Sequence, residues 1–103
     1  MRKGRKMMTF YVTAEQSAAL RAHSRLEGES GRALIVRLLT TYLADPTSME
    51  AGRVPTRRAT VRKSIDLDDE VVRLLHEHTY ETGESGAALV RRLLESYFSS
   101  RLA

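Results

Sequence analysis

Two short segments of the chain alternate between apolar and polar residues, and each is followed by two stretches with helical spacing. Met8, Phe10 and Val12 alternate with Met7, Thr9 and Tyr11, and later Val61, Ile65 and Leu67 alternate with Arg62, Ser64 and Asp66. A period of two over about six residues predicts a strand with one buried face. Lys63 interrupts the apolar side of the second segment. We therefore expect two short strands, each with one exposed face.

The stretches directly after the strands predict helices over 14–27 and 69–82. Their apolar residues recur at helical intervals, as in Ala19, Leu20 and Leu26 or in Val71, Leu74 and Leu75. Thr13 and Asp68 stand at the N-cap positions, where a short polar side chain accepts backbone N–H groups. Gln16 follows Thr13 at the spacing of a capping box, which strengthens the first prediction.

A second helix is predicted in each half. Gly28 and Gly83 suit the left-handed residue that ends a helix. Two positions later, a serine in each half is placed to cap the next helix. These second helices are expected over about 31–44 and 86–99, and the first of them places Leu34, Ile35, Leu38, Leu39 and Tyr42 on one side.

The two halves are copies of one another. A shift of 55 residues aligns 28–42 with 83–97, and ten of these 15 positions are identical. Residues that match across the shift include His23/His78, Glu29/Glu84, Arg37/Arg92 and Tyr42/Tyr97. The repeated unit is about 45 residues long and is too small to bury a sizeable core alone. The copies are therefore expected to share one core.

This organisation defines a first repeat at 1–44, a linker at 45–59 and a second repeat at 60–103. Asp45-Pro46 ends the preceding helix, because the residue before proline disfavours the helical conformation. The linker contains both prolines of the chain and reaches up to about 50 Å when extended. We expect a mostly α fold with a short two-stranded antiparallel ribbon, in the order β-α-α-linker-β-α-α.

The charges are concentrated in two segments. The chain carries a net charge of +4, yet residues 1–6 and 53–63 hold nine of its 17 basic residues and no acidic residue. The remaining eight basic residues face 13 acidic ones. An acidic body with two basic segments is typical of a protein that binds a polyanion, although flexible ends often carry such charge simply for solubility.

Composition narrows the function classes further. Cysteine is absent, which excludes disulfides and thiolate metal sites. No apolar run approaches the roughly 18 residues of a membrane span, and the basic N-terminus lacks the apolar segment of a signal peptide. His76 and His78 fall on different sides of a helix, and the equivalent His23 and His78 are expected in structural roles. No catalytic constellation or nucleotide loop stands out, so we expect no enzyme, metal, cofactor or small-molecule ligand.

The short alternating strand, the capped helix, the Gly-x-Ser turn and the leucine-rich helix together resemble the ribbon-helix-helix (MetJ/Arc-like) DNA-binding family. The resemblance covers about 13–43 and 60–98 and does not include the linker. Members of the family are normally homodimers, whereas the duplication here indicates that one chain supplies both halves of a tandem ribbon-helix-helix pseudo-dimer. It also implies a transcriptional repressor, or a plasmid or conjugation accessory factor, in the bacterial cytoplasm on the nucleoid or a plasmid. Double-stranded DNA is the implied partner, with further copies of the chain bound cooperatively and no membrane contact.

The resemblance further implies where DNA is contacted. Base contacts come from the outward strand positions: Met7, Thr9, Tyr11, Arg62, Ser64 and Asp66. Phosphate contacts come from the start of each second helix, at Ser30, Gly31, Arg32, Ser85, Gly86 and Ala87, where free N–H groups and the helix dipole favour an anion. The basic segments add Arg2, Lys3, Arg5, Lys6, Arg57 and Arg58.

Several readings remain open at this point. Asp66 either accepts a hydrogen bond from a cytosine amino group or helps to cap the next helix. Glu29 and Glu84 are unfavourable next to the predicted phosphate sites. Arg37 and Arg92 either contact DNA or have a solvated or inter-helix role. An antitoxin or protein-interaction module of the same fold is the alternative function, although such antitoxins usually carry a further toxin-binding tail after the last helix.

Overall fold

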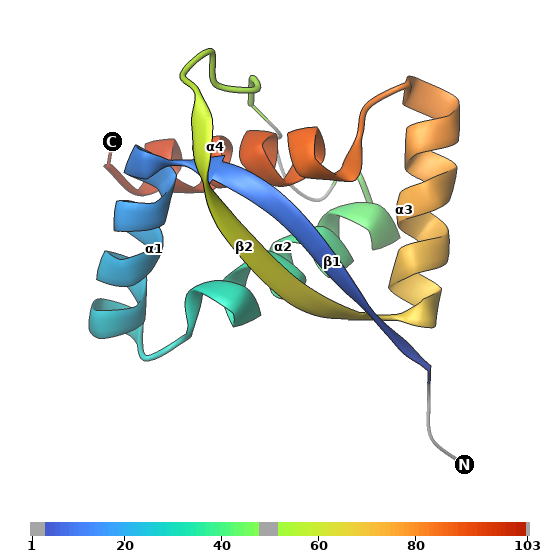
Figure 1. Cartoon of the computed structure of the whole chain (residues 1–103), viewed down its shortest axis with the longest axis horizontal. Helices are drawn as coiled ribbons and strands as arrows, with labels where there is room; N and C mark the ends of the chain where they lie inside the picture. Colours follow the sequence, from blue (N-terminus) through green and yellow to red (C-terminus); the bar gives the residue numbers. More distant parts are fainter. Residues whose placement is uncertain (1–3, 48–51, 103) are drawn as a thin grey trace.

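The computed structural model describes residues 4–47 and 52–102 and contains two strands and four helices in those ranges (Figure 1). The elements are β1 (Arg5–Thr13), α1 (Ala14–Glu27), α2 (Gly31–Ala44), β2 (Ala59–Asp68), α3 (Asp69–Thr82) and α4 (Gly86–Leu102). The bounds of α1, α2 and α3 are those predicted from the sequence. α4 runs past the predicted end at 99, and residues 100–102 include neither proline nor glycine. β2 begins inside the predicted linker, where Ala59 pairs with Thr13.

The two strands form one antiparallel ribbon, as predicted. Thr9 is the partner of Ser64, which is also its counterpart in the 55-residue shift. The two strands are therefore paired symmetrically about these equivalent residues. Moving along the ribbon from this central pair, the residue number rises in one strand and falls in the other. The register is continuous until an irregularity between Val12 and Thr13.

The ribbon has one buried and one exposed face. Phe10, Val12, Ile65 and Leu67 are each at most 2% exposed and face the helices. Lys63 lies opposite Phe10 on this side and is half-buried, so the predicted interruption of the apolar face is present. Figure 1 shows the ribbon crossing the front of the molecule, with α1 and α3 at its left and right and with α2 and α4 behind it.

The helices of the two halves interleave. α2 packs against β2 and α3, whereas α4 packs against β1 and α1. A single buried cluster contains residues from both repeats, including Leu34 and Leu39 of α2 and Leu89 and Leu94 of α4. Burial of such side chains is the main stabilising term for a domain of this size.

The helix ends follow the sequence closely, with one exception. The side chain of Thr13 accepts the N–H of Gln16, whose side chain in turn accepts the N–H of Thr13. Asp68 stands at the N-cap of α3 but makes no side-chain cap hydrogen bond; its carboxylate lies 3.8 Å from Arg5 instead. Gly28 and Gly83 end α1 and α3 with φ of 72° and 79°, a conformation that glycine adopts at no steric cost.

One apolar position was predicted wrongly. Leu26 belongs to the helical pattern of 14–27, but its side chain is 81% exposed. α1 turns Leu20 into the core, and Leu26, six residues later, is rotated by about 120° from it around the helix axis, which takes it out of the core-facing side.

Candidate nucleic-acid interface

The outer face of the ribbon carries all six side chains predicted to contact bases. Across the two strands, Met7 is paired with Asp66, Thr9 with Ser64 and Tyr11 with Arg62. All are exposed except Ser64, which is half-buried. The hydroxyls of Thr9 and Ser64 lie 3.2 Å apart and hydrogen-bond across the middle of the ribbon. The structure thus brings the six residues into three rows on one surface.

The two ends of this surface differ in chemistry. One end presents the carboxylate of Asp66 beside the thioether of Met7, which is 70% exposed. The other presents the guanidinium of Arg62 beside the phenol of Tyr11. Asp68, rather than Asp66, occupies the N-cap position of α3, so the suggested capping role of Asp66 is wrong.

A groove lies beside the Arg62 end of the ribbon. It has a volume of about 730 Å³ and is enclosed by β2, α1 and the start of α2. Its lining comprises Leu20, Arg21, Ser24, Ser30, Gly31, Arg32, Ile35, Arg62, Lys63 and Ser64. Four of these side chains are cationic, and none of the lining residues in the described part of the chain is acidic. We call this hollow the basic groove.

The start of α2 forms one wall of the basic groove. Ser30 caps the helix by accepting the N–H of Ala33 at 3.1 Å. A side chain at Gly31 would come within 3.2 Å of Leu20 Cβ, so the glycine lets α2 begin close against α1. The first turn of a helix directs N–H groups and the positive end of its dipole outward, which favours an anion at this wall.

The positions that the repeat equates with these four cations hold no lysine or arginine. The 55-residue shift relates the four cations, Arg21, Arg32, Arg62 and Lys63, to His76, Ala87, Met7 and Met8 respectively. Met8 packs against the start of α4, since a Cβ on Gly86 would lie 2.8 Å from Met8 Cε. Ser85 still caps α4 by accepting the N–H of Ala88. The start of α4 therefore has the same capped geometry as the start of α2 but lacks the surrounding cations. This applies to the predicted phosphate contacts Ser85, Gly86 and Ala87, in comparison with Ser30, Gly31 and Arg32.

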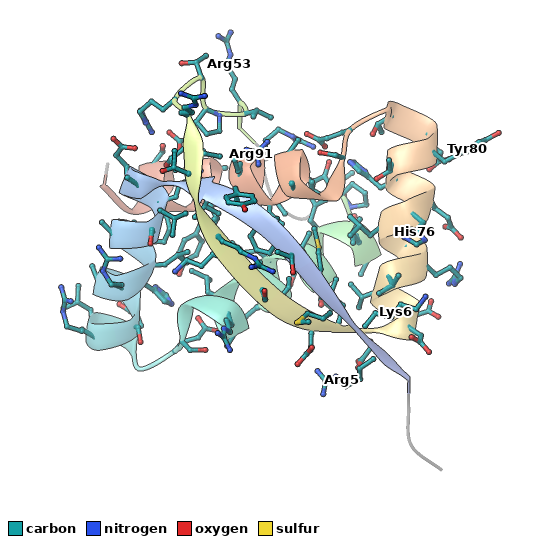
Figure 2. All side chains as sticks on the ribbon, in the orientation of Figure 1. Arg5, Lys6, Arg53, His76, Tyr80 and Arg91 are labelled. Carbon is teal, nitrogen blue, oxygen red and sulfur yellow. The ribbon has the colours of Figure 1, made fainter. Side chains whose placement is uncertain are left out.

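The basic segments lie at opposite ends of the ribbon (Figure 2). Figure 2 shows Arg5 and Lys6 at the lower end of the view and Arg53 at the upper end. Arg57 hydrogen-bonds to Glu15 at 3.1 Å and to Glu95 at 3.4 Å in an exposed position. Exposed ion pairs of this kind contribute at most about 1 kcal/mol, so they exchange readily for another anion. Arg58 is exposed, and the predicted contacts Arg2 and Lys3 fall outside the described residues.

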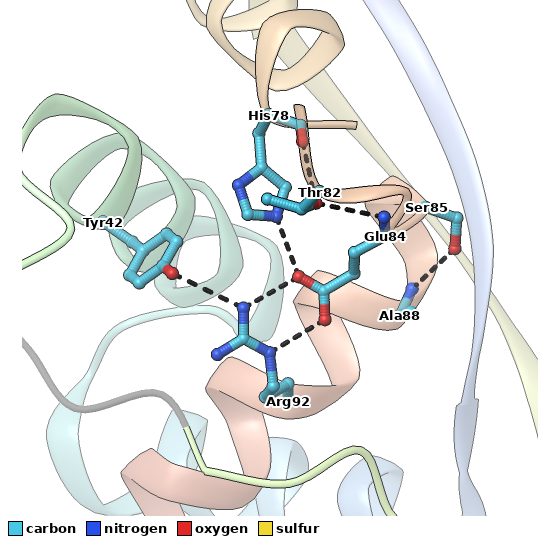
Figure 3. Close-up of polar contacts among 7 residues, drawn as sticks. All are labelled: Tyr42, His78, Thr82, Glu84, Ser85, Ala88 and Arg92. Atoms are coloured by element: carbon cyan, nitrogen blue, oxygen red, sulfur yellow. Dashed lines mark hydrogen bonds and ion pairs between the residues drawn. The ribbon is translucent and has the colours of Figure 1, made fainter. Parts of the chain in front are cut away.

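The two glutamates next to the helix starts are already neutralised. Arg92 binds Glu84 through two nitrogens at 2.8 and 2.7 Å, and His78 binds the same carboxylate at 2.8 Å (Figure 3). In the first repeat, Glu29 has the same two kinds of partner, Arg37 and His23. We call these clusters the carboxylate networks. They answer the open question about Arg37 and Arg92, which link helix to loop within each repeat.

The networks change the protonation of both carboxyl groups. Hydrogen bonds from Arg37 and then His23 lower the pKa of Glu29 from 4.5 to about 2. The hydrogen bond from Arg92 lowers the pKa of Glu84, while burial opposes the shift and His78 adds to it. Both glutamates are therefore ionised and paired at neutral pH, and their charge is compensated before an anion approaches the nearby helix.

Each carboxylate network is completed by a tyrosine from the other repeat. Tyr42 accepts a hydrogen bond from Arg92 at 3.4 Å and lies edge-on to His78, with 6.0 Å between the ring centres (Figure 3). Tyr97 stands in the same relation to the first network, with its ring centre 5.8 Å from that of His23. Sequence reasoning placed the tyrosines in packing roles but missed the networks. The signal was present, because all four residue types are identical across the repeat.

Comparison with protein-family models, with characterised proteins and with solved structures finds no match. In the described part of the chain, no helix combines the length and the apolar character needed to cross a membrane.

Proposed function

We propose that this chain binds double-stranded DNA in a sequence-specific manner, with its ribbon in the major groove. The observation that carries the proposal is the outer face of the ribbon: six exposed or half-exposed side chains in three cross-strand rows, directly beside the basic groove. The major groove of B-DNA is about 12 Å wide and admits a two-stranded ribbon whose alternate side chains reach base edges.

The proposal includes the tandem ribbon-helix-helix arrangement. In it, β1-α1-α2 and β2-α3-α4 act as the two halves of a pseudo-dimer built from one chain. The antiparallel pairing of equivalent positions, Thr9 with Ser64, supports this arrangement, as do the exchanged contacts of α2 and α4. A bacterial transcriptional repressor or a plasmid or conjugation accessory factor is the biological role that fits such a protein.

The proposed roles of the ribbon side chains follow from their chemistry. Arg62 makes a bidentate contact with guanine, which is the commonest specific contact in the major groove. Thr9 and Ser64, at the centre of the ribbon, donate or accept hydrogen bonds to base edges. Asp66 accepts a hydrogen bond from a cytosine amino group. Because the two ends of the ribbon differ, the preferred site is asymmetric rather than palindromic.

The basic groove supplies the main phosphate anchor. A backbone phosphate beside the ribbon meets the N-terminus of α2 together with Arg21, Arg32 and Lys63. Charge-assisted hydrogen bonds of this kind are stronger than neutral ones and are fixed in geometry for arginine. The start of α4 contributes a weaker, uncharged contact at the other end.

Selection of bound duplexes from a random pool, followed by titration of the selected site at several salt concentrations, tests the proposal. For about six neutralised phosphates, the logarithm of affinity should fall with the logarithm of salt at a slope near −5. A flat salt dependence, or the absence of any enriched sequence, would contradict it.

Variants separate base readout from phosphate binding. Arg62→Ala is expected to relax preference at one base pair, at a cost of about 1–3 kcal/mol for the selected site and little for unrelated DNA. Arg57→Ala and Lys3→Ala are the controls, because they should weaken binding evenly across sequences. If Arg62→Ala also weakens all sequences evenly, the assignment of Arg62 to base recognition is wrong.

A further inference from the structure

The most exposed large apolar side chains of the described residues lie at the two ends of the molecule. Tyr80 on α3 is 89% exposed and Leu26 on α1 is 81% exposed. α1 and α3 stand at opposite ends of the long axis in Figure 1, and Figure 2 shows Tyr80 pointing away from the body. Both side chains lie away from the outer face of the ribbon, so the proposed contact with bases does not use them.

The outer side of α3 forms a hollowed surface around Tyr80. A depression of about 680 Å³ is lined there by Val72, His76 and Tyr80 together with charged neighbours. The helix residues of this surface, which we call the α3 end face, are Asp69, Val72, Arg73, His76, Glu77, Tyr80 and Glu81. Three are acidic and one, Arg73, is basic and pairs with Glu77, so the helix contributes net negative charge. Lys6 of β1 also lines the depression.

The outer side of α1 has the opposite character. The 55-residue shift maps the α3 end face onto Ala14, Ser17, Ala18, Arg21, Ala22, Arg25 and Leu26, which we call the α1 end face. It carries two arginines and no acid. Ser17 is buried beneath it, and the alanines leave Leu26 as its one exposed large apolar side chain. Equivalent positions of the two repeats thus carry opposite charge. The large side chains of the α3 end face correspond to small side chains on the α1 end face.

We propose that the α1 end face of one copy of this chain binds the α3 end face of a second copy. Tyr80 then packs over the alanines and Leu26 of the neighbour, and Arg25 approaches Glu81. Contact between like faces is disfavoured, because it brings arginine to arginine or glutamate to glutamate. A head-to-tail contact of this kind does not close on itself and continues as an open row of molecules.

The contact is small, so the association is weak. Two single helices bury less than the roughly 1,200 Å² of a standard interface, so we expect a dissociation constant in the high micromolar range. Neighbouring molecules on one DNA duplex reach an effective concentration of that order, where such a contact becomes cooperative.

Sedimentation equilibrium of the full chain without DNA tests the proposal. Between about 10 μM and about 1 mM, the average mass should rise from 11.6 kDa and pass twice that value without a plateau. A mass that stays at 11.6 kDa throughout, or that levels off at a dimer, overturns the head-to-tail contact.

Two charge reversals make the test specific. Arg25→Glu and Glu81→Arg should each hold the protein at the monomer mass, because each places like charges across the contact. They change the net charge in opposite directions, so a common effect is not one of total charge. An equimolar mixture of the two variants should recover the rising mass. The unaltered faces of the two variants bind each other as in the parent protein, so growth beyond a dimer is what depends on the altered α1 end face matching the altered α3 end face.

The mixture decides between a specific contact and general loss of solubility or fold. Circular dichroism of each variant should match the parent protein, because both residues are exposed on helix surfaces. A mixture that remains monomeric, or a single variant that associates like the parent, overturns the proposal. No step uses DNA, so failure here leaves the proposed DNA binding standing, and failure of DNA binding leaves this result standing.

Discussion

The first and second repeats share the buried leucines of α2 and α4 and differ in the exposed side chains around the starts of these helices. Leu34 and Leu89 are both 0% exposed, and the carboxylate networks use the same four residue types in both halves. By contrast, the surroundings of the two helix starts differ: Arg32 and Lys63 lie at the start of α2, and the equivalent positions at the start of α4 are Ala87 and Met8. The shared core fixes shape and hydrogen bonding in both halves at once. The outer surface has no such constraint, so the two ends are able to take different roles.

The largest expected effect tests whether the two repeats are packed equally well in the core. Leu34→Ala and Leu89→Ala should each lower the free energy of unfolding by about 2–5 kcal/mol, because each leaves a cavity in a fully packed site. We expect the two costs to agree within about 1 kcal/mol, since both residues are completely buried. Urea denaturation followed by circular dichroism measures both. A large difference would show that the halves pack unequally.

A second comparison sets the two carboxylate networks against each other. Glu84→Gln leaves Arg92, whose side chain is 20% exposed, without its counter-charge, whereas Glu29→Gln leaves Arg37, which is 51% exposed. Loss of Glu84 should cost about 1–3 kcal/mol of stability, and loss of Glu29 should cost less, because Arg37 is able to regain water. Thermal unfolding of both variants at pH 7 gives the difference. Equal costs would argue that exposure of the arginine is unimportant.

The carboxylate networks also make the stability of the fold depend on pH. The pKa of Glu29 is lowered from 4.5 to about 2, and that of Glu84 is lowered as well. A carboxyl group with a lowered pKa in the folded state stabilises the fold above its ordinary pKa, and this stabilisation disappears as the pH falls through the folded value. The melting temperature should therefore fall between about pH 4.5 and pH 2. The two Gln variants should flatten this fall, and an unchanged profile would exclude the networks as its cause.

A smaller effect is expected where the repeats differ. Arg32→Ala should reduce affinity for the selected duplex about tenfold and make the salt slope shallower by about one phosphate. The converse change, Ala87→Arg, introduces the missing cation at the start of α4 and should tighten binding by a comparable factor. Filter binding or fluorescence anisotropy at matched salt measures both. If Arg32→Ala has no effect, the basic groove is not the phosphate anchor.

Much of the local structure was predictable because its causes are local. The period-two pattern identified the strands and their exposed residues, and the capping box of Thr13 and Gln16 marked the start of α1. Gly28 and Gly83 marked the helix ends through the need for a positive φ. Asp68 shows the limit of this reasoning. A residue type that suits a cap turned to Arg5 instead, because strand pairing brought that cation within reach.

The candidate site was predictable in part. The six outward ribbon residues followed from alternation alone, and the structure places them on one surface. The basic groove was not predictable, because Arg21, Arg32 and Lys63 belong to three separate elements. Their convergence depends on where α1 and α2 stand relative to β2.

The sequence by itself determined the order of elements, their caps, the duplication and the two faces of each strand, since these depend on neighbours a few residues apart. Tertiary structure alone decided which side chains share a groove, which tyrosine completes which carboxylate network, and that Leu26 and Tyr80 stand free at opposite ends. Those features join residues from distant parts of the chain. Their relative positions are set by packing of the shared core, which no local pattern encodes.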